Sequence, residues 1–201
     1  MQVFKMKTIS VGAELISLEQ ARNHLKVDTY GSPEISDDDD FITVLITAAR
    51  ERIEGLLNLS VVSKVVEIAF DNFNSEMSLY GPIQELTSVK YIDELEAEQT
   101  LDSVVYTLDE YAKVPKLVLS YRQYWPKSYN VINAVKVLAK VGFTDGLSPD
   151  DNPCPKAIIQ AMLLTIGHLY KNRESTTDQN LKELPEGIVS LIYHHRVNLG
   201  M

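Results

Sequence analysis

The sequence contains one cysteine, Cys154, among 201 residues. A single cysteine cannot form an intramolecular disulfide, and such scarcity is typical of a chain that folds in a reducing compartment. The first fifteen residues lack the continuous apolar segment of a secretion signal. No run of apolar residues approaches the ~20 that a membrane-spanning helix needs. We therefore expect a protein that is made in a cytoplasm and has no membrane partner.

Short motifs that carry common chemistry are also missing. The sequence has no G-x-S-x-G nucleophile turn, no phosphate-binding loop, no G-x-G-x-x-G and no H-E-x-x-H. Cys154 lies between two prolines without a histidine cue, which favours a small buried residue over a nucleophile. His194 and His195 are adjacent, so on a helix they point about 100° apart and cannot share one metal. We expect no catalytic residue, no metal and no cofactor.

Positive charge is in short supply. The chain has 19 Lys and Arg against 28 Asp and Glu, a net charge of -9. A protein that wraps nucleic acid needs the opposite balance. The four consecutive aspartates at 37–40 do not form a calcium loop, because such loops alternate their ligands and carry a glycine. They are better placed to cap the following helix and to complement its dipole, at ~0.3–1 kcal/mol each.

Apolar residues, at 45% of the chain, suffice for an ordinary core. Their spacing near both ends is helical. Ser17 and Gln20 have the spacing of a capping box. The strongest stripe runs from Phe41 to Leu57 and includes Val44, Arg52 and Leu56. The segment Ala157–Tyr170 is apolar nearly all round, which predicts a buried central helix. The predicted helices cover Ser17–Val27, Phe41–Asn58, Ala157–Tyr170 and 185–196.

Between these helices the pattern changes to short β-rich runs separated by Asn, Asp, Pro and Gly. The order predicts an α+β protein in which N- and C-terminal helices form a bundle with a mostly antiparallel β insertion. We expect a helical core of 13–59 plus 150–197, a β-rich insertion of 60–145, and terminal arms at 1–12 and 198–201. The predicted strands are Val61–Phe70, Met77–Tyr80, Leu86–Asp93, Glu98–Leu101, Val104–Leu108, Leu117–Ser120 and Ala134–Val141.

Charge is segregated within the β-rich region. Residues 93–110 hold seven acidic side chains and no basic one, whereas residues 111–140 hold six basic side chains, several aromatics and no acidic one. The two segments can pair within one subunit, form an interface between subunits, or contact single-stranded nucleic acid. The candidates for a subunit interface are Glu94, Glu96, Glu98, Lys113, Lys116, Arg122 and Trp125.

The ordered series of segments resembles the small head–tail connector (adaptor) proteins of tailed bacteriophages and related prophages, from about Ala13 to Val197. LISLEQARNHLKVD and DDDDFITVLITAARERIEGLLN are similar to the family's two N-terminal helices. GPIQELTSVKYIDE and QTLDSVVYTLD are similar to its central β segment, and Trp125-Pro126 and Gly142-Phe143 stand in the expected places. IIQAMLLTIGHLYKNRES and LPEGIVSLIYHHRV look like its C-terminal helices. The turn DELEAEQ departs from the family pattern, which usually has a glycine there.

This resemblance implies a structural virion protein of the neck, assembled in the host bacterial cytoplasm. It implies a ring of about twelve copies that docks on the portal protein, receives a stopper or tail-terminator protein, and lets double-stranded DNA pass without specific binding. The C-terminal helix is expected to expose an apolar face for the portal. The alternative is a cytoplasmic protein-binding regulatory module without a virion role. The portal-docking candidates are Ile188, Leu191, Ile192, Tyr193, Arg196, Leu199 and Met201.

Overall fold

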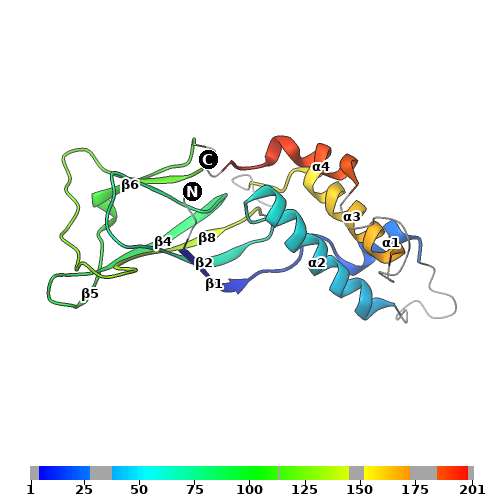
Figure 1. Cartoon of the computed structure of the whole chain (residues 1–201), viewed down its shortest axis with the longest axis horizontal. Helices are drawn as coiled ribbons and strands as arrows, with labels where there is room; N and C mark the ends of the chain where they lie inside the picture. Colours follow the sequence, from blue (N-terminus) through cyan, green and yellow to red (C-terminus); the bar gives the residue numbers. More distant parts are fainter. Residues whose placement is uncertain (1–4, 28–37, 113, 145–151, 173–184, 199–201) are drawn as a thin grey trace. The chain divides into compact units, whose positions relative to one another are not determined.

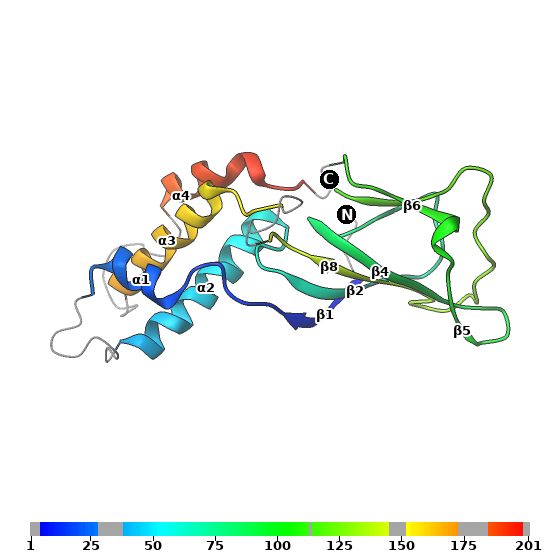
Figure 2. The same cartoon turned by 180° about the vertical axis from the view of Figure 1, so that it is seen from behind.

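A computed structural model describes residues 5–27, 38–112, 114–144, 152–172 and 185–198. Within these ranges it contains four α-helices and eight β-strands, so the predicted α+β class is confirmed (Figure 1). The chain divides into two compact units. The helical unit comprises residues 14–61 and 153–196, and the β unit comprises 1–13, 62–152 and 197–201. Figure 2 shows the same elements from behind.

Helix α1 (Leu18–Leu25) opens the helical unit, and its first turn contains the predicted capping box. The Ser17 hydroxyl accepts from the Gln20 N–H at 3.1 Å, and the Gln20 side chain accepts from the Ser17 N–H at 3.0 Å. These two bonds satisfy N–H groups that a helix start otherwise leaves unpaired. Lys26, in the left-handed region at φ 55°, ends the helix.

Helix α2 (Asp39–Leu57) ends, as predicted, at Asn58, whose φ of 56° is left-handed. The buried stripe is rotated from the predicted one. Val44 is 63% exposed and Arg52 is exposed, whereas Arg50 is buried. Ile42 and Ile46 are fully or almost fully buried, whereas Phe41 is half-buried beside Tyr170 of α3, with ring centroids 6.2 Å apart, and Val44 faces solvent. The full buried set is Ile42, Leu45, Ile46, Ala49, Arg50, Ile53, Glu54 and Leu57.

Of the aspartates predicted to cap α2 and complement its dipole, Asp39 and Asp40 do lie in its first turn, but the predicted cap is not formed by the N-cap residue. Asp38 makes no side-chain cap bond. Its carboxylate instead accepts a 2.5 Å hydrogen bond from the Tyr170 hydroxyl, and Asp39 forms an ion pair with Arg22. Asp37 lies outside the described residues. The acidic run therefore links the start of α2 to its neighbouring helices, which offers more stabilisation than a solvent-exposed cap.

Helices α3 (Lys156–Lys171) and α4 (Glu186–Ile192) complete the unit, followed by the 3-10 turn η2 (Tyr193–His195). Helix α3 contacts α1, α2 and α4, which matches its predicted central place. It is not buried all round, because Leu164 is 39% exposed. None of the described helices is both long and apolar enough to cross a bilayer.

The β unit contains two antiparallel sheets. One has the order β1-β2-β8-β4-β5 and the other the order β3-β7-β6. The inner faces share one core, to which β2, β4 and β8 contribute alternate valines and isoleucines while β3 and β7 contribute Met77 and Leu117. The strands are β1 (Lys5–Val11), β2 (Lys64–Phe70), β3 (Glu76–Ser78), β4 (Ile83–Ile92), β5 (Glu98–Thr100), β6 (Tyr106–Asp109), β7 (Lys116–Leu119) and β8 (Val135–Val141).

Strand β1 lies where the sequence predicted only a terminal arm at 1–12. Its sequence KMKTISV alternates polar and apolar residues except at Lys7-Thr8, but all seven residues are exposed, so the alternation does not mark a buried face. Its order comes from backbone pairing with β2, from Lys5 opposite Ala69 to Val11 opposite Lys64. Because of this pairing the first thirteen residues group with the β unit.

Gly142, which ends β8, is required by its surroundings. Its φ is +105°, and an added Cβ would lie 2.0 Å from the Val62 carbonyl oxygen. A backbone in this region strains any residue with a side chain. The glycine lets the end of β8 pass directly against the chain that enters β2.

Candidate interaction surfaces

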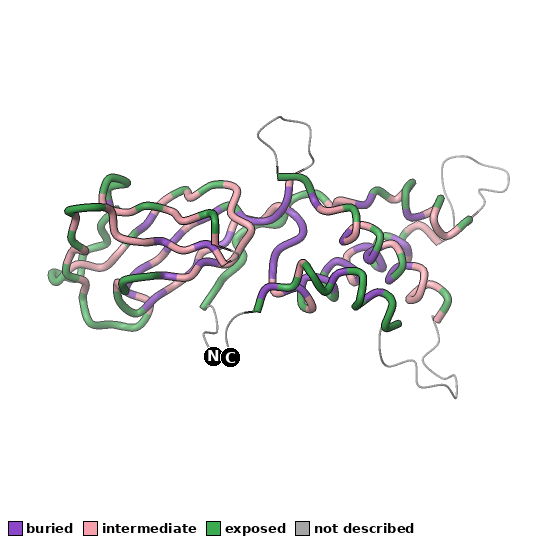
Figure 3. Tube along the Cα trace, turned by 90° about the horizontal axis from the view of Figure 1, so that it is seen from above, coloured by how far each residue is buried: buried purple, intermediate pink, exposed green. Residues whose placement is uncertain are grey.

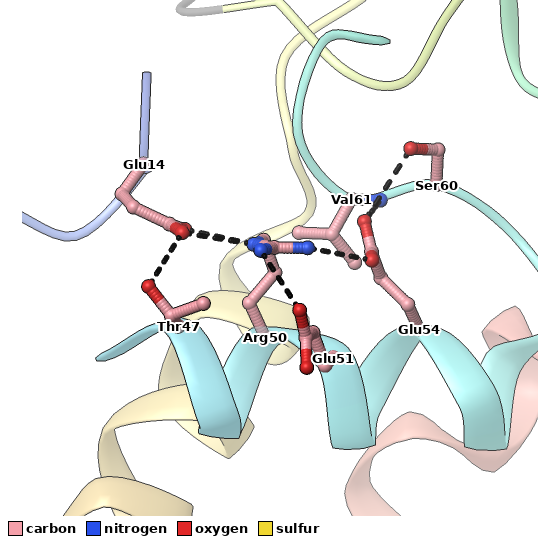
Figure 4. A network of polar contacts seen from close by, with 7 residues as sticks. All are labelled: Glu14, Thr47, Arg50, Glu51, Glu54, Ser60 and Val61. Atoms are coloured by element: carbon pink, nitrogen blue, oxygen red, sulfur yellow. Dashed lines mark hydrogen bonds and ion pairs between the residues drawn. The ribbon is translucent and has the colours of Figure 1, made fainter. Parts of the chain in front are cut away.

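A buried polar network organises one side of α2 (Figure 4). The Arg50 side chain donates to Glu14 at 2.9 Å and to Glu54 at 2.9 Å. The Glu54 carboxylate also accepts from the Val61 N–H at 2.8 Å and from the Ser60 hydroxyl at 3.4 Å. Arg50 and Glu54 are 5% and 7% exposed.

One cation, Arg50, faces two carboxylates, Glu14 and Glu54, inside this network. Burial by itself would lower the pKa of Arg50, but the hydrogen bond and charge of Glu14 and the charge of Glu54 outweigh it and raise that pKa. The network ties the chain that enters the helical unit, at Glu14, and the chain that leaves it, at Val61, to a single helix. This network was not predicted from the sequence. The available signal was the oppositely charged i, i+4 pair Arg50 and Glu54. Arg50 lies four residues after the apolar Ile46 and so on the same side of the helix.

Exposed aromatic and aliphatic side chains gather at one end of the β unit. The loop 121–133 runs beside the β4–β5 turn, because the Tyr129 N–H donates to the Ile92 carbonyl at 2.8 Å and Lys127 lies 3.6 Å from Glu94. Figures 1 and 2 both place this loop and β5 at the same end of the unit, and Figure 3 colours that end mostly exposed. We call it the tip surface: Leu95 (86% exposed), Tyr121 (85%), Tyr124 (86%), Tyr129 (40%) and Ile132 (74%).

The tip surface has the composition of a protein-binding site. Large apolar side chains at this exposure lose water contact only when a partner covers them, and tyrosine is enriched where partners meet. Arg122 lies over the Tyr121 ring, 5.1 Å from its centroid. Its backbone is left-handed at φ 60°. This pairing presents one positive charge among the rings.

The acidic β4–β5 turn has a defined geometry although it lacks the glycine of the resembling family. The Asp93 carboxylate accepts from the N–H groups of Leu95 at 2.9 Å and Ala97 at 3.0 Å. The Ala97 bond, followed by one from the Gln99 side chain, lowers the pKa of Asp93. Glu96 takes the left-handed position at φ 63°. The aspartate therefore stabilises a turn that a glycine makes easily.

The predicted subunit-interface residues fall into two groups. Glu94, Glu96, Glu98 and Arg122 are exposed. Of these, Glu94 lies near Lys127, and Glu98 pairs with Lys90 at 2.8 Å. The remaining candidates are engaged inside the unit or undescribed: Lys116 pairs with Glu76 at 2.6 Å, Trp125 stacks on Phe73 with ring centroids 4.9 Å apart, and Lys113 lies outside the described residues.

Charge pairing within the chain is thus one visible use of the segregated segments. Lys127 and Glu94 join them by side chains, and Asp109 stands opposite Lys116 across the β6–β7 pair. Trp125 cannot offer its Nε1 to a partner, since that atom is buried without a hydrogen bond among the described residues. An interface between subunits and a contact with single-stranded nucleic acid stay predictions.

The portal-docking prediction needs one correction. Helix α4 does not expose Ile188 and Ile192, which are 3% and 2% exposed because this side of the helix packs on α3. Leu191 (37%), Tyr193 (64%) and Arg196 are exposed. The exposed surface of α4 and the residues that follow it therefore includes fewer apolar side chains than predicted. Leu199 and Met201 lie outside the described residues.

Groups that could carry chemistry are few. Cys154 is buried, and burial raises its thiol pKa to about 12 against a weaker opposing effect of the Lys156 charge. In the part of the chain that the structure describes, no three His, Cys, Asp or Glu side chains come together as a metal site would require.

No protein-family model and no curated protein matches the sequence. Solved structures match over nearly the whole chain. A chain from the neck of an empty GTA particle, computed with C6 symmetry, has a TM-score of 0.76, and one from the virion of a native gene transfer agent particle has 0.73. Both are 18% identical and cover 98% of this chain and 97% of their own.

A third match comes from the neck of a native GTA particle computed with C12 symmetry, with a TM-score of 0.69, 18% identity and 97% coverage of both chains. At this identity the likeness concerns the fold, and it extends through both units. The chain therefore shares, from end to end, the fold of chains in the neck of gene transfer agent particles, in agreement with the resemblance to head–tail connectors.

Proposed function

We propose that this chain is a structural subunit of the neck of a phage-like particle, where copies form a ring. As a head–tail adaptor the ring docks on the portal, extends the DNA channel and offers a platform for the tail. The observation that carries the proposal is the end-to-end fold match, which covers 97–98% of both chains and includes both units.

Ring formation is supported by the symmetry of the matching particles. The neck structures were computed with C6 and C12 symmetry. A ring of twelve copies is compatible with both. Closed rings need a heterologous interface, in which two different patches of each subunit meet.

We assign portal docking to the helical unit. The exposed side chains of Leu191, Tyr193 and Arg196 supply an apolar, an aromatic and a cationic contact, the residue types that anchor many interfaces. Ile188 and Ile192 hold α4 against α3 and so keep these side chains in place. Leu199 and Met201 follow directly along the chain and would extend the contact.

We assign the tail-side contact, to a stopper or tail-terminator protein, to the tip surface. Its three tyrosines are 40–86% exposed. Its acidic neighbours Glu94 and Glu96 argue against tight binding of phosphate, as does the net charge of -9. Double-stranded DNA would pass the ring without being held, which suits a channel.

Assembly is tested by electron microscopy and native mass spectrometry of the purified chain, alone over a range of concentrations and with the portal protein. We expect closed rings at high concentration or on the portal. The variant Tyr193→Ala with Arg196→Ala should fold but bind portal at least tenfold more weakly. The matched control is Val44→Ser, which removes an equally exposed apolar side chain from α2. A strict twofold dimer under all conditions, with or without portal, would refute the proposal.

Tail attachment is tested in cells that produce the particle. The variant Tyr121→Ser with Tyr124→Ser should give heads that carry the ring but no tail. Tyr111→Ser is the control, since Tyr111 is fully exposed at the other end of β7. Normal tailed particles from the double variant would remove the tip surface from the proposal. A chain that forms no ring, ignores the portal and binds a host protein would favour a regulatory module.

A further inference from the structure

The five-stranded sheet has two open edges. Strand β1 forms one edge and β5 the other, and no described strand pairs with the outer side of either. All of β1 is exposed, including the apolar side chains of Met6 (39%), Ile9 (53%) and Val11 (51%). Open edges with apolar side chains readily accept another strand, and proteins usually protect them.

The charges on the two edges are opposite. Residues 5–11 include Lys5 and Lys7 and no acidic residue, whereas residues 98–102 include Glu98 and Asp102 and no basic residue. Lysines on an edge strand normally discourage pairing with another strand, because their charges would be brought close to it. A strand that carries carboxylates offsets this effect, so the β1 edge favours an acidic partner strand. Lys7 makes no ion pair with any described residue, which leaves its charge available.

The register across the sheet places the two edges at the same height. Lys5 stands opposite Ala69, Ala69 opposite Lys136, Lys136 opposite Lys90, and Lys90 opposite Thr100. These five residues form one row that begins on β1 and ends on β5. A rotation about an axis parallel to the strands keeps every row at its height. In a ring whose axis runs along the strands, edge-to-edge pairing would therefore set Thr100 of one copy beside Lys5 of the next.

We propose that β1 of each copy pairs with β5 of the neighbouring copy, so that the sheets join around the ring. Each pair in the sheet is antiparallel, so β1 and β5 run in the same direction and the new pair is parallel. Lys5 then lies beside Thr100 of the neighbour; Lys5 and Glu98 are already paired inside the chain with Asp71 and Lys90, so Lys7 is the cation that this edge offers to the neighbour. The interface is heterologous, as a closed ring requires. This inference rests on the proposed ring function and names the contact that closes it.

Cross-linking between variants that each carry one added cysteine tests the pairing. Lys5→Cys and Thr100→Cys are made in separate chains. The two variants are mixed in equal amounts, and wild-type chain is added so that rings form. A short bis-maleimide cross-linker is then added. Within one chain the two positions are four strand spacings apart, about 19 Å, so the linker joins them only between copies. Cys154 is buried and does not compete.

Cross-linked dimers should appear only when both variants are present, at least tenfold above either variant alone. A chain that carries both substitutions should give a ladder that stops at the ring size. Rings seen by electron microscopy without this cross-link would overturn the pairing and leave the adaptor function standing. If wild type forms no ring, alone or on the portal, the adaptor function fails and the pairing fails with it.

Discussion

Replacing Arg50 with methionine tests the energetic role of the buried network. Methionine has a similar length but no charge, so Arg50→Met leaves the Glu54 carboxylate, 7% exposed, without its cation. Removing one partner of a buried ion pair costs about 3–5 kcal/mol, because the remaining charge stays desolvated. For a chain of this size that lowers the melting temperature by roughly 6–20 °C.

A double variant separates the stranded charge from lost packing. Adding Glu54→Gln to Arg50→Met removes the stranded charge while the amide oxygen can still accept from the Val61 N–H. We expect this double variant to regain most of the lost stability. Arg52→Met is the control, since Arg52 is exposed on the same helix and its loss should change the free energy of unfolding by less than ~0.5 kcal/mol.

Urea unfolding, followed by far-UV circular dichroism and extrapolated to water, measures these free energies. An Arg50→Met variant as stable as Arg52→Met would show that the network is not a desolvated charge cluster. A double variant as unstable as Arg50→Met alone would show that lost packing, not the stranded carboxylate, causes the effect.

The remaining predictions concern a thiol, two glycines and α4. Because burial raises the pKa of Cys154 to about 12, its alkylation at pH 8 should be roughly 1000-fold slower than that of an ordinary thiol. Denaturant should restore the ordinary alkylation rate. An ordinary rate in the native protein would contradict this prediction. Gly142→Ala should lower the free energy of unfolding by at least ~2 kcal/mol, because the added Cβ would meet the Val62 carbonyl oxygen. Gly55→Ala, with open space around Gly55, should stabilise α2 by ~0.5–1 kcal/mol. Equal melting temperatures for the two variants would refute the distinction. Ile188→Ala should cost ~2–5 kcal/mol in urea unfolding, while Tyr193→Ala should cost less than ~0.5 kcal/mol; the reverse order would mean that α4 faces the other way.

Local patterns determined much of the helical unit. The capping box at Ser17 and the end of α2 at Asn58 follow from residues close in sequence, and both are as predicted. The β-rich runs Val61–Phe70 and Ala134–Val141 likewise predicted strands that correspond to β2 and β8. These features depend on side chains within a few residues of one another, so one sequence suffices to find them.

Tertiary structure decided the features that depend on distant partners. Strand β1 buries neither of its faces and is held by backbone pairing with β2. Arg50 resembles a surface residue in the sequence, yet Glu14 and Glu54 allow it to be buried. The sequence predicted Ile188 on an exposed face, whereas α3 covers it.

The chain's surfaces show the same division most clearly. Charge segregation between 93–110 and 111–140 was visible in the sequence, but which charges neutralise one another was not. Lys116 belongs to the basic segment, yet it pairs with Glu76, forty residues away. It therefore does not neutralise the acidic side chains of the β4–β5 turn. The common height of Lys5 and Thr100 depends on four successive strand pairings. Such registers are set by backbone hydrogen bonds between segments far apart in the chain, and only the folded sheet fixes them.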